Sequence, residues 1–301
     1  MEMEINKLAY RFYSLARTSA RTFGVSKVLR RTVGPLAARL VFKSSANSGQ
    51  PFVIQGHKMF LAPKGRYPSP DMVVDRYEQA TTKLFRRLIQ PGMVVVDVGA
   101  NIGYFTLIAA ELVGPSGTVY AFEPEPENYG LLNKNIHLNA YSNIKPIETA
   151  VSNECGSTQL FLSAMDHGSH SIYDAAARGV TATHTVVTTT LDAFLEGEGW
   201  PNVDLVKIDV EGAETRVLDG MEQLCEQSSG FNLIIEYCPA LIHATGAKPS
   251  DLLDKLASMN LKVQFVDEKN GVMAPEAADP DLITAKLLKQ ETYMNLLCSR
   301  K

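Results

Sequence analysis

The sequence predicts an α/β fold with a doubly wound sheet, and three observations support this class. Strand and helix patterns alternate from residue 93 to the C-terminus. The first strand of this series, residues 93–98, is a β-branched run that directly follows the helix breaker Pro91-Gly92. Acidic residues and glycines follow the strands, at the sheet edge where such folds bind ligands. A chain of 301 residues, 45% of them hydrophobic, suffices to bury such a sheet in one large domain.

Residues 1–50 are expected to form a basic helical segment and a linker. Nine basic and two acidic residues between positions 1 and 43 give a net charge of +7, which leaves −11 for the rest of a chain whose total is −4. Apolar residues recur at helical spacing. No apolar run approaches the about 18 residues of a membrane span, and arginines interrupt any signal-peptide core. The segment therefore either caps the folded domain or attaches it peripherally to an anionic membrane surface.

Residues 51–90 are expected to lead into the core through a β-hairpin and a helix. The hairpin would pair residues 52–54 with 59–61 around Gly56-His57. A helical pattern over residues 75–88 then ends before the helix breaker.

Residues 91–301 are expected to hold the doubly wound, Rossmann-like domain, in which helices join successive parallel strands. Two of its strands flank a loop rich in Ser and His, which lies between the two halves of the fold. The expected elements are strand 93–98, helix 102–112, strand 118–122, helix 127–138, strand 144–150, strands 159–163 and 185–191, strand 203–208, helix 213–225, strand 231–236, helix 250–259, and strands 262–266 and 293–298.

A glycine-rich turn follows the first strand of the domain. It reads Asp97-Val98-Gly99-Ala100-Asn101-Ile102-Gly103-Tyr104. Its glycines allow a ligand to approach the backbone closely at a helix N-terminus. The dinucleotide fingerprint G-x-G-x-x-G is not met, because Asn101 and Tyr104 occupy its second and third glycine positions. The carboxylate of Asp97 would repel a pyrophosphate and attract a cation.

The second strand ends in a carboxylate that suits a ribose. Glu123 lies 26 positions after Asp97, about the offset at which an acidic residue binds ribose hydroxyls in this class of fold. Together these carboxylates suit a nucleoside that carries positive charge and no phosphate. S-adenosylmethionine has this chemistry, with its ribose at Glu123 and its ammonium and sulfonium groups near Asp97. A purely structural turn and the site of an NAD-dependent oxidoreductase are the alternatives.

A second charged cluster follows the strand that begins the second half. It reads Lys207-Ile208-Asp209-Val210-Glu211-Gly212-Ala213-Glu214. The crevice of a doubly wound sheet opens where the strand order reverses, so Asp209 and Glu211 should face the same pocket as Gly99. Glu214 is expected to stabilise the N-terminus of the next helix. Lys207 is expected to pair with one of these acids.

With the strings Val96 to Gly103, Phe122-Glu123-Pro124 and Lys207 to Glu214 in this order, residues from about 92 to 237 resemble the FkbM-type S-adenosylmethionine-dependent methyltransferases. The resemblance implies a seven-stranded methyltransferase sheet, mostly parallel with the last strand antiparallel. It implies O-methyl transfer to a sugar, glycolipid or secondary metabolite. It assigns the methionine part of the cofactor to Asp97, Gly99, Asn101 and Gly103, the ribose to Glu123, and closure of the site to Asp209. It does not identify the acceptor.

An alcohol acceptor must lose a proton during methyl transfer, so the site needs a general base. The candidates are Asp209, Glu211, His167 and His170. Both histidines belong to the loop between the two halves, which is placed to cover the crevice as a lid. Glu236 could join Asp209 in holding a divalent ion, since hard cations prefer oxygen ligands. Two acids do not define a metal site, however, and no metal is predicted.

Composition restricts partners and compartment. A net charge of −4 gives no attraction to nucleic acid. The four cysteines lack C-x-x-C spacing, so no zinc or disulfide framework is expected and a reduced, cytoplasmic compartment fits. The expected partner is a small-molecule or saccharide acceptor, and no oligomeric state is predicted. A catalytically silent binding or scaffold protein at a membrane surface is the alternative from another functional class.

Overall fold

The structure of the chain is a computed structural model, which describes residues 50–61, 69–73, 75–163, 170–174, 179–228, 230–268, 271–273 and 279–300. Residues 1–49 and His167 lie outside the described residues, so the expectations for the basic segment and for this histidine stay predictions. The chain divides into two compact units, residues 1–77 and residues 78–301.

In the first unit, β1 (Phe52–Ile54) pairs antiparallel with β2 (His57–Met59), and the short helix α3 (Ser69–Val73) follows. The prediction of a second strand at residues 59–61 is wrong. The reason is that a two-residue hairpin turn favours positive φ at both central residues, and Gln55-Gly56 adopt it with φ of 51° and 98°.

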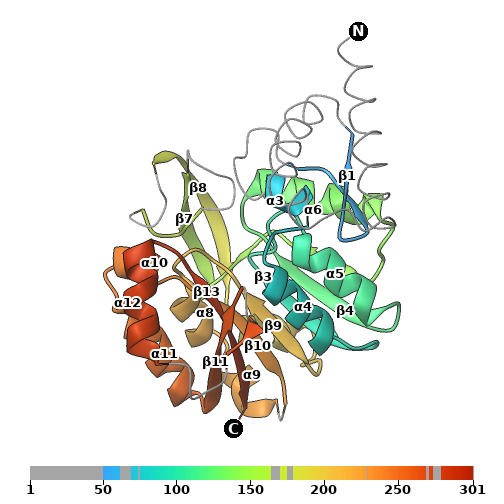
Figure 1. Cartoon of the computed structure of the whole chain (residues 1–301). Helices are drawn as coiled ribbons and strands as arrows, with labels where there is room; N and C mark the ends of the chain where they lie inside the picture. Colours follow the sequence, from blue (N-terminus) through green and yellow to red (C-terminus); the bar gives the residue numbers. More distant parts are fainter. Residues whose placement is uncertain are drawn as a thin grey trace, which may run out of the picture. The chain divides into compact units, whose positions relative to one another are not determined.

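The second unit is built on a sheet with the strand order β12-β11-β13-β10-β9-β3-β4-β5 (Figure 1). The bounds are β3 (Val94–Val98), β4 (Thr118–Phe122), β5 (Ile144–Ile147), β9 (Leu205–Ile208), β10 (Asn232–Tyr237), β11 (Leu261–Asp267), β12 (Gly271–Val272) and β13 (Met294–Arg300). The central strands pair in parallel, whereas β13 is antiparallel to both β10 and β11. The predicted doubly wound sheet with an antiparallel last strand is confirmed, and among the described residues β12 extends it at one edge.

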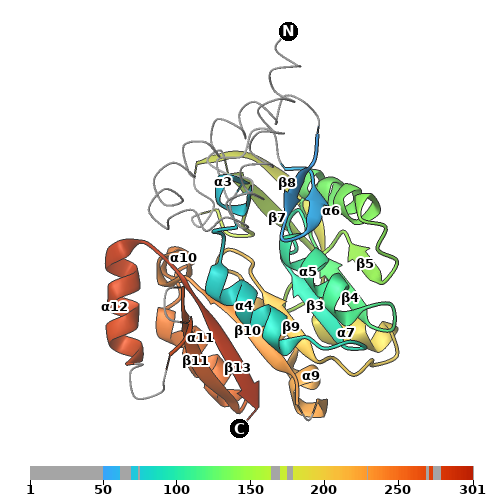
Figure 2. The same cartoon turned by 45° about the vertical axis from the view of Figure 1, so that its right-hand side comes forward.

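Helices cover both faces of this sheet. Their bounds are α4 (Gln79–Leu88), α5 (Tyr104–Val113), α6 (Pro126–Leu138), α7 (Leu191–Gly197), α8 (Glu214–Asp219), α9 (Glu222–Gln227), α10 (Pro239–Ala244), α11 (Pro249–Ser258) and α12 (Pro280–Gln290). Figures 1 and 2 show α4 and α5 on one face and α8 and α11 on the other. The core of the second face joins Val98 and Val206 of the strands to Leu218 of α8 and Leu252 of α11, all nearly fully buried.

Two predicted strands have wrong bounds, and the second of them also begins earlier than predicted, at Val180. The strand expected at residues 144–150 splits into β5 and β6 (Ala150–Val151), and β6 belongs to a different sheet. The strand expected at residues 185–191 ends at Thr189, and Leu191 begins α7. The side chain of Thr190 caps this helix by accepting a hydrogen bond from Ala193 N at 3.0 Å, which stops the strand.

The helices also differ from the prediction in detail. The helix expected at residues 75–88 begins only at Gln79, because Asp75 and Glu78 have positive φ. The helix expected at residues 213–225 is broken by Gly220, where a Cβ would lie 2.1 Å from the carbonyl oxygen of Ser152. Helices α10 and α12 were not predicted, although each begins with the proline that is typical of a first helical turn.

A second, three-stranded sheet is inserted between β5 and α7. It has the order β6-β8-β7, with β7 (Gly156–Ser163) antiparallel to β8 (Val180–Thr189) and β6 parallel to β8. Among the helices that the structure describes, none combines the length and the apolar character of a membrane span.

Candidate active site

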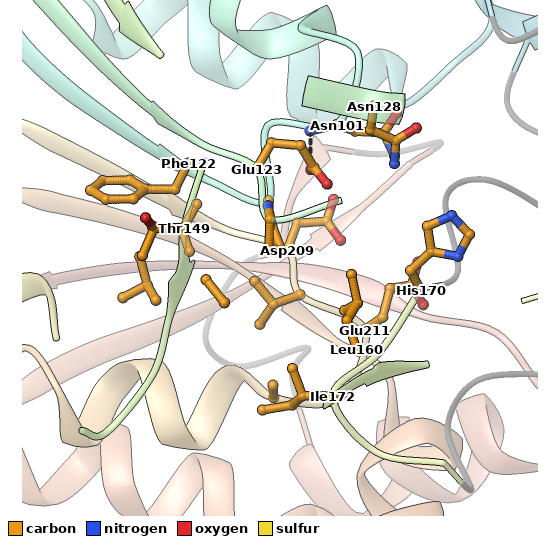
Figure 3. Close-up of a pocket in the computed structure, with 17 residues that line it drawn as sticks. Asn101, Phe122, Glu123, Asn128, Thr149, Leu160, His170, Ile172, Asp209 and Glu211 are labelled. Carbon is orange, nitrogen blue, oxygen red and sulfur yellow. Dashed lines mark hydrogen bonds between the residues drawn. The ribbon is translucent and has the colours of Figure 1, made fainter. Parts of the chain in front are cut away.

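A pocket with about 600 Å³ of empty space, open to solvent, lies where β3, β4 and β9 end (Figure 3). β9 comes late in the chain but pairs with β3, so the pocket lies where the strand order reverses. The lining residues are Val98, Gly99, Asn101, Phe122, Glu123, Pro124, Asn128, Thr149, Ala150, Val151, Leu160, His170, Ile172, Asp209, Val210, Glu211 and Ala213. Six of the nine site residues predicted from the sequence therefore meet here: Gly99, Asn101, Glu123, His170, Asp209 and Glu211.

The glycine turn is shaped by what packs against it. Gly99 has a φ of 82°, and a Cβ at this position would lie 1.8 Å from the carbonyl oxygen of Asp209. Gly103 has a φ of 96°, and its Cβ would lie 2.8 Å from Leu132 Cδ1 of α6. Only Gly99 lines the pocket. Gly99 thus lets β9 approach β3, whereas Gly103 lets α6 pack on the start of α5.

Glu123 is held by backbone amides. Its Oε2 accepts a hydrogen bond from Asn101 N at 2.8 Å, and its Oε1 accepts one from Glu125 N at 3.0 Å. Asn101 has a φ of 51°, which aims its N–H at the carboxylate. Burial raises the pKa of Glu123 to about 7, although these two hydrogen bonds oppose the shift. The carboxylate joins the ends of β3 and β4 and still has lone pairs for a ligand.

Asp97 lies beneath the turn and is not a lining residue. Its side chain is fully buried, and Oδ2 accepts a hydrogen bond from Thr106 Oγ1 at 2.6 Å. Oδ1 has no hydrogen-bond partner within the described residues. Burial raises the pKa of Asp97, while the charge of Lys207 acts in the opposite direction. A contact of Asp97 with the cofactor stays a prediction, and so does that of Gly103.

Asp209 is the carboxylate at the end of β9. Its N–H donates to Val98 O at 3.0 Å, and its Oδ2 lies 2.9 Å from Lys207 Nζ. The Lys207 side chain is 3% exposed and that of Asp209 20% exposed. The predicted pairing of Lys207 with one of the acids is confirmed, with Asp209 as the partner.

The remaining acids of this region have different surroundings. Glu211 lines the pocket, whereas Glu214 and Glu236 do not. Glu214 Oε1 accepts hydrogen bonds from Val210 N and Gly212 N, and burial raises its pKa to about 7. Glu236 is buried, its Oε2 has no hydrogen-bond partner in the described chain, and burial raises its pKa well above the ordinary value. No cluster of three or more His, Cys, Asp or Glu residues suited to a metal ion occurs among the residues described.

His170 lies at the end of the pocket opposite Phe122 and Thr149 (Figure 3). Its Nδ1 accepts a hydrogen bond from Ser163 N at 3.0 Å, so a neutral imidazole carries its proton on Nε2. The ring can take up a further proton as a neutral base only after the bond to Ser163 breaks. Next to it, Ser171 Oγ donates to Glu211 O at 2.8 Å, which ties this part of the loop to the pocket.

Several lining residues were not predicted from the sequence. Leu160 of β7 and Ile172 of the connection between β7 and β8 contribute an apolar wall, and Thr149 lies between β5 and β6. Asn128 comes from the first turn of α6, where its N–H donates to the capping side chain of Glu125 at 2.6 Å. Of these four residues, only Asn128 could have been placed near the pocket from the sequence, because it follows the predicted end of β4 by a few residues.

Comparison with known proteins assigns this fold and pocket to a family. The sequence profile of the methyltransferase FkbM domain matches residues 97–263, more than half of the chain. The chain belongs to the FkbM methyltransferase family. Hexuronic acid methyltransferase AglP of Haloferax volcanii is 30% identical over 191 residues, which cover 63% of this chain and 72% of AglP. The 31-O-demethyl-FK506 methyltransferase FkbM of Streptomyces tacrolimicus is 35% identical over 164 residues, 44% of this chain and 61% of that protein.

The resemblance stated from the sequence is thereby confirmed, and the chain is a methyltransferase. All the pocket-lining residues of this FkbM methyltransferase, from Val98 to Ala213, fall inside the matched range. The inserted sheet β6-β8-β7 falls inside it as well.

Proposed function

We propose that this FkbM methyltransferase uses S-adenosylmethionine to methylate a hydroxyl oxygen of a sugar, glycolipid or secondary metabolite. The observation that carries the proposal is the position of Glu123. This carboxylate lines the pocket at the end of β4, and each of its oxygens accepts one backbone N–H. The Asn128 side chain also hydrogen-bonds to Glu123, and the acceptor capacity that remains suits the hydroxyls of a ribose.

The charge of the pocket supports the same cofactor. Among the lining residues that the structure describes, Glu123, Asp209 and Glu211 are carboxylates and none is Lys or Arg. Such a lining favours a ligand with ammonium and sulfonium groups and opposes the pyrophosphate of NAD. An oxidoreductase is therefore the less favoured function.

Different residues of the pocket bind the cofactor, accept the proton and exclude water. Glu123 and the backbone of the turn at Gly99 bind and orient the nucleoside. When bound, S-adenosylmethionine supplies a methyl group made reactive by a positively charged sulfur. Asp209 accepts the proton of the acceptor hydroxyl, with Glu211 as the second candidate for this role. Leu160 and Ile172 exclude water from one side of the pocket.

The acceptor class comes from the relatives. AglP is named for a hexuronic acid and the Streptomyces protein for O-methylation of an FK506 precursor. Both acceptors carry hydroxyl groups, which is why a saccharide or a natural product is proposed here.

The test combines binding with product analysis. Calorimetry should show binding of S-adenosylhomocysteine and no comparable binding of NAD. Extract of a deletion strain, incubated with protein and S-adenosylmethionine, should yield a product one methylene unit heavier and resistant to mild alkali. Preferential binding of NAD would favour the oxidoreductase, and an alkali-labile product would indicate a carboxyl acceptor. Cofactor binding without any methyl transfer would favour the silent scaffold.

Replacing Glu123 with Ala should weaken binding of S-adenosylhomocysteine about ten- to hundredfold, because a charge-assisted hydrogen bond worth about 1.5–3 kcal/mol is lost. Calorimetry measures the change. Glu127→Ala is the matched control, since Glu127 is a nearby glutamate that is exposed in the first turn of α6 and does not line the pocket. Equal affinity of the folded Glu123→Ala protein and the wild type would remove the ribose assignment.

Binding of S-adenosylhomocysteine should also strengthen as the pH rises from about 6 to about 8. Glu123 has a pKa of about 7 in the free protein, so it is largely protonated at the lower pH, whereas ribose hydroxyls donate best to the ionised form. The same raised pKa means that this group's contribution to folding stability falls as the pH rises from its ordinary value of 4.5 through 7. Calorimetry across this range tests the binding effect. A Glu123→Gln protein with the same pH dependence as the wild type would contradict it.

A further inference from the structure

Lys207 is a buried lysine at the end of a central strand. It is 2% exposed and lies on β9, directly opposite Asp97 of β3 in the parallel register. Its Nζ lies 2.9 Å from Asp209 Oδ2 and 4.8 Å from the centroid of the Phe105 ring of α5. Lys207 thus pairs with the carboxylate at the pocket, and its position on β9 is in register with the residue that carries the carboxylate beneath the glycine turn.

The charges around Lys207 outweigh the effect of burial. Burial alone would lower its pKa, but the carboxylates of Asp209, Asp97 and Glu78 raise it, so the lysine stays charged. Asp209 in turn interacts with two more buried acids, Glu214 and Glu236. Burying a lysine costs free energy unless its charge is matched, and an apolar residue of similar size often stabilises a fold equally well. The burial of Lys207 therefore indicates a role beyond stability.

We propose that Lys207 is a positioning residue for methyl transfer, whose buried ammonium group holds the Asp209 carboxylate in a fixed orientation at the pocket. This inference rests on the proposed function, because it takes Asp209 to meet the acceptor hydroxyl. Lys207 itself does not line the pocket.

Asp209 is held at three of its atoms. Its N–H is bonded to Val98, its carbonyl oxygen packs where Gly99 has no Cβ, and its Oδ2 is bonded to Lys207. The first two contacts place the backbone and leave the carboxylate free to rotate. Among the contacts of the described residues, the ion pair with Lys207 is the one that holds the carboxylate, and it leaves Oδ1 for the acceptor.

The test uses two substitutions in the full chain. Lys207→Gln keeps a hydrogen-bond donor but removes the charge, and Lys207→Arg keeps the charge. Lys255→Gln is the matched control, because Lys255 also pairs with two carboxylates, Asp219 and Glu222, but away from the pocket. The readout is the chemical shift and linewidth of the Asp209 carboxyl ¹³C resonance, assigned by its loss in Asp209→Asn. Calorimetry with S-adenosylhomocysteine is measured in parallel.

In Lys207→Gln the Asp209 carboxyl resonance should shift and broaden, because the carboxylate loses the ion pair that fixes its orientation. Lys207→Arg and Lys255→Gln should leave the resonance near its wild-type position, and affinity for S-adenosylhomocysteine should change little in all three. The rate of methyl transfer at saturating S-adenosylmethionine, measured on the deletion-strain extract, should fall about 10- to 100-fold in Lys207→Gln. If Lys207→Gln does not fold, Lys207→Met removes the same charge and should show the same change.

An unchanged Asp209 resonance in the charge-removing variants would overturn the inference, and so would an equal change in Lys207→Arg. The proposed function can fail separately, because it is judged by cofactor binding and methyl transfer in the wild type. Absence of methyl transfer together with a changed Asp209 resonance in Lys207→Gln would reject the O-methyltransferase. Methyl transfer with an unchanged resonance would reject only the role of Lys207.

Discussion

Replacing Asp209 with Asn is expected to slow methyl transfer by about 10²–10⁴-fold, the usual contribution of a general base. The substitution keeps the shape of the side chain and removes its charge. Affinity for S-adenosylhomocysteine should stay close to that of the wild type, because Glu123 and the glycine turn remain in place. Initial rates with radiolabelled S-adenosylmethionine and calorimetry separate the two effects.

Two companion variants decide how the result for Asp209→Asn is interpreted. Asp254→Asn changes an exposed aspartate of α11 and should leave the rate unchanged. Glu211→Gln removes the other carboxylate of the β9–α8 connection that lines the pocket. A full loss of rate in Glu211→Gln with a normal rate in Asp209→Asn would transfer the role of base to Glu211. An equal loss of cofactor affinity in Asp209→Asn would make Asp209 a cofactor ligand.

Gly99→Ala is expected to lower the free energy of unfolding by about 2–6 kcal/mol, through roughly 1–3 kcal/mol of backbone strain and a similar amount from overpacking. The new Cβ would lie 1.8 Å from the carbonyl oxygen of Asp209, on a backbone with a φ of 82°. The end of β9 must move away from β3, so binding of S-adenosylhomocysteine should weaken as well. Chemical denaturation and calorimetry measure the two losses.

Gly246→Ala provides a control with matched strain. Gly246 has a φ of 88°, and nothing lies within 4 Å of the Cβ that alanine would add. It should therefore show only the strain of about 1–3 kcal/mol and normal cofactor binding. If the two variants lose the same stability and Gly99→Ala binds the cofactor normally, then the close contact with Asp209 does not shape the site.

Elements whose signal lies in a few adjacent residues were predicted well. The β-branched run before the glycine turn became β3 with a shift of one residue, and the predicted strand 118–122 coincides with β4. Glu123 could be placed at the pocket because it directly follows a strand, and parallel strands end at one edge of the sheet. The order of the three motifs was sufficient to identify the family.

Contacts between distant segments were outside the reach of the sequence. The β-branched residues near 150 read as one continuous strand, but Ala150 leaves the main sheet to pair with Thr188. Gly220 breaks a helix because it packs on Ser152, 68 positions earlier in the chain. Neither partner can be recognised from the local pattern.

The sequence by itself determined the fold class, the family and the two strand-end carboxylates of the site, because strand periodicity, helix breakers and motif spacing are local properties of the chain. Only the tertiary structure decided that Gly99 makes room for the carbonyl of Asp209, that Lys207 is buried opposite Asp97, and that the inserted sheet supplies the apolar wall. These features arise from atoms brought within a few ångströms by strand pairing across about a hundred residues. Burial and charge at such distances depend on the packed sheet, which no stretch of sequence contains.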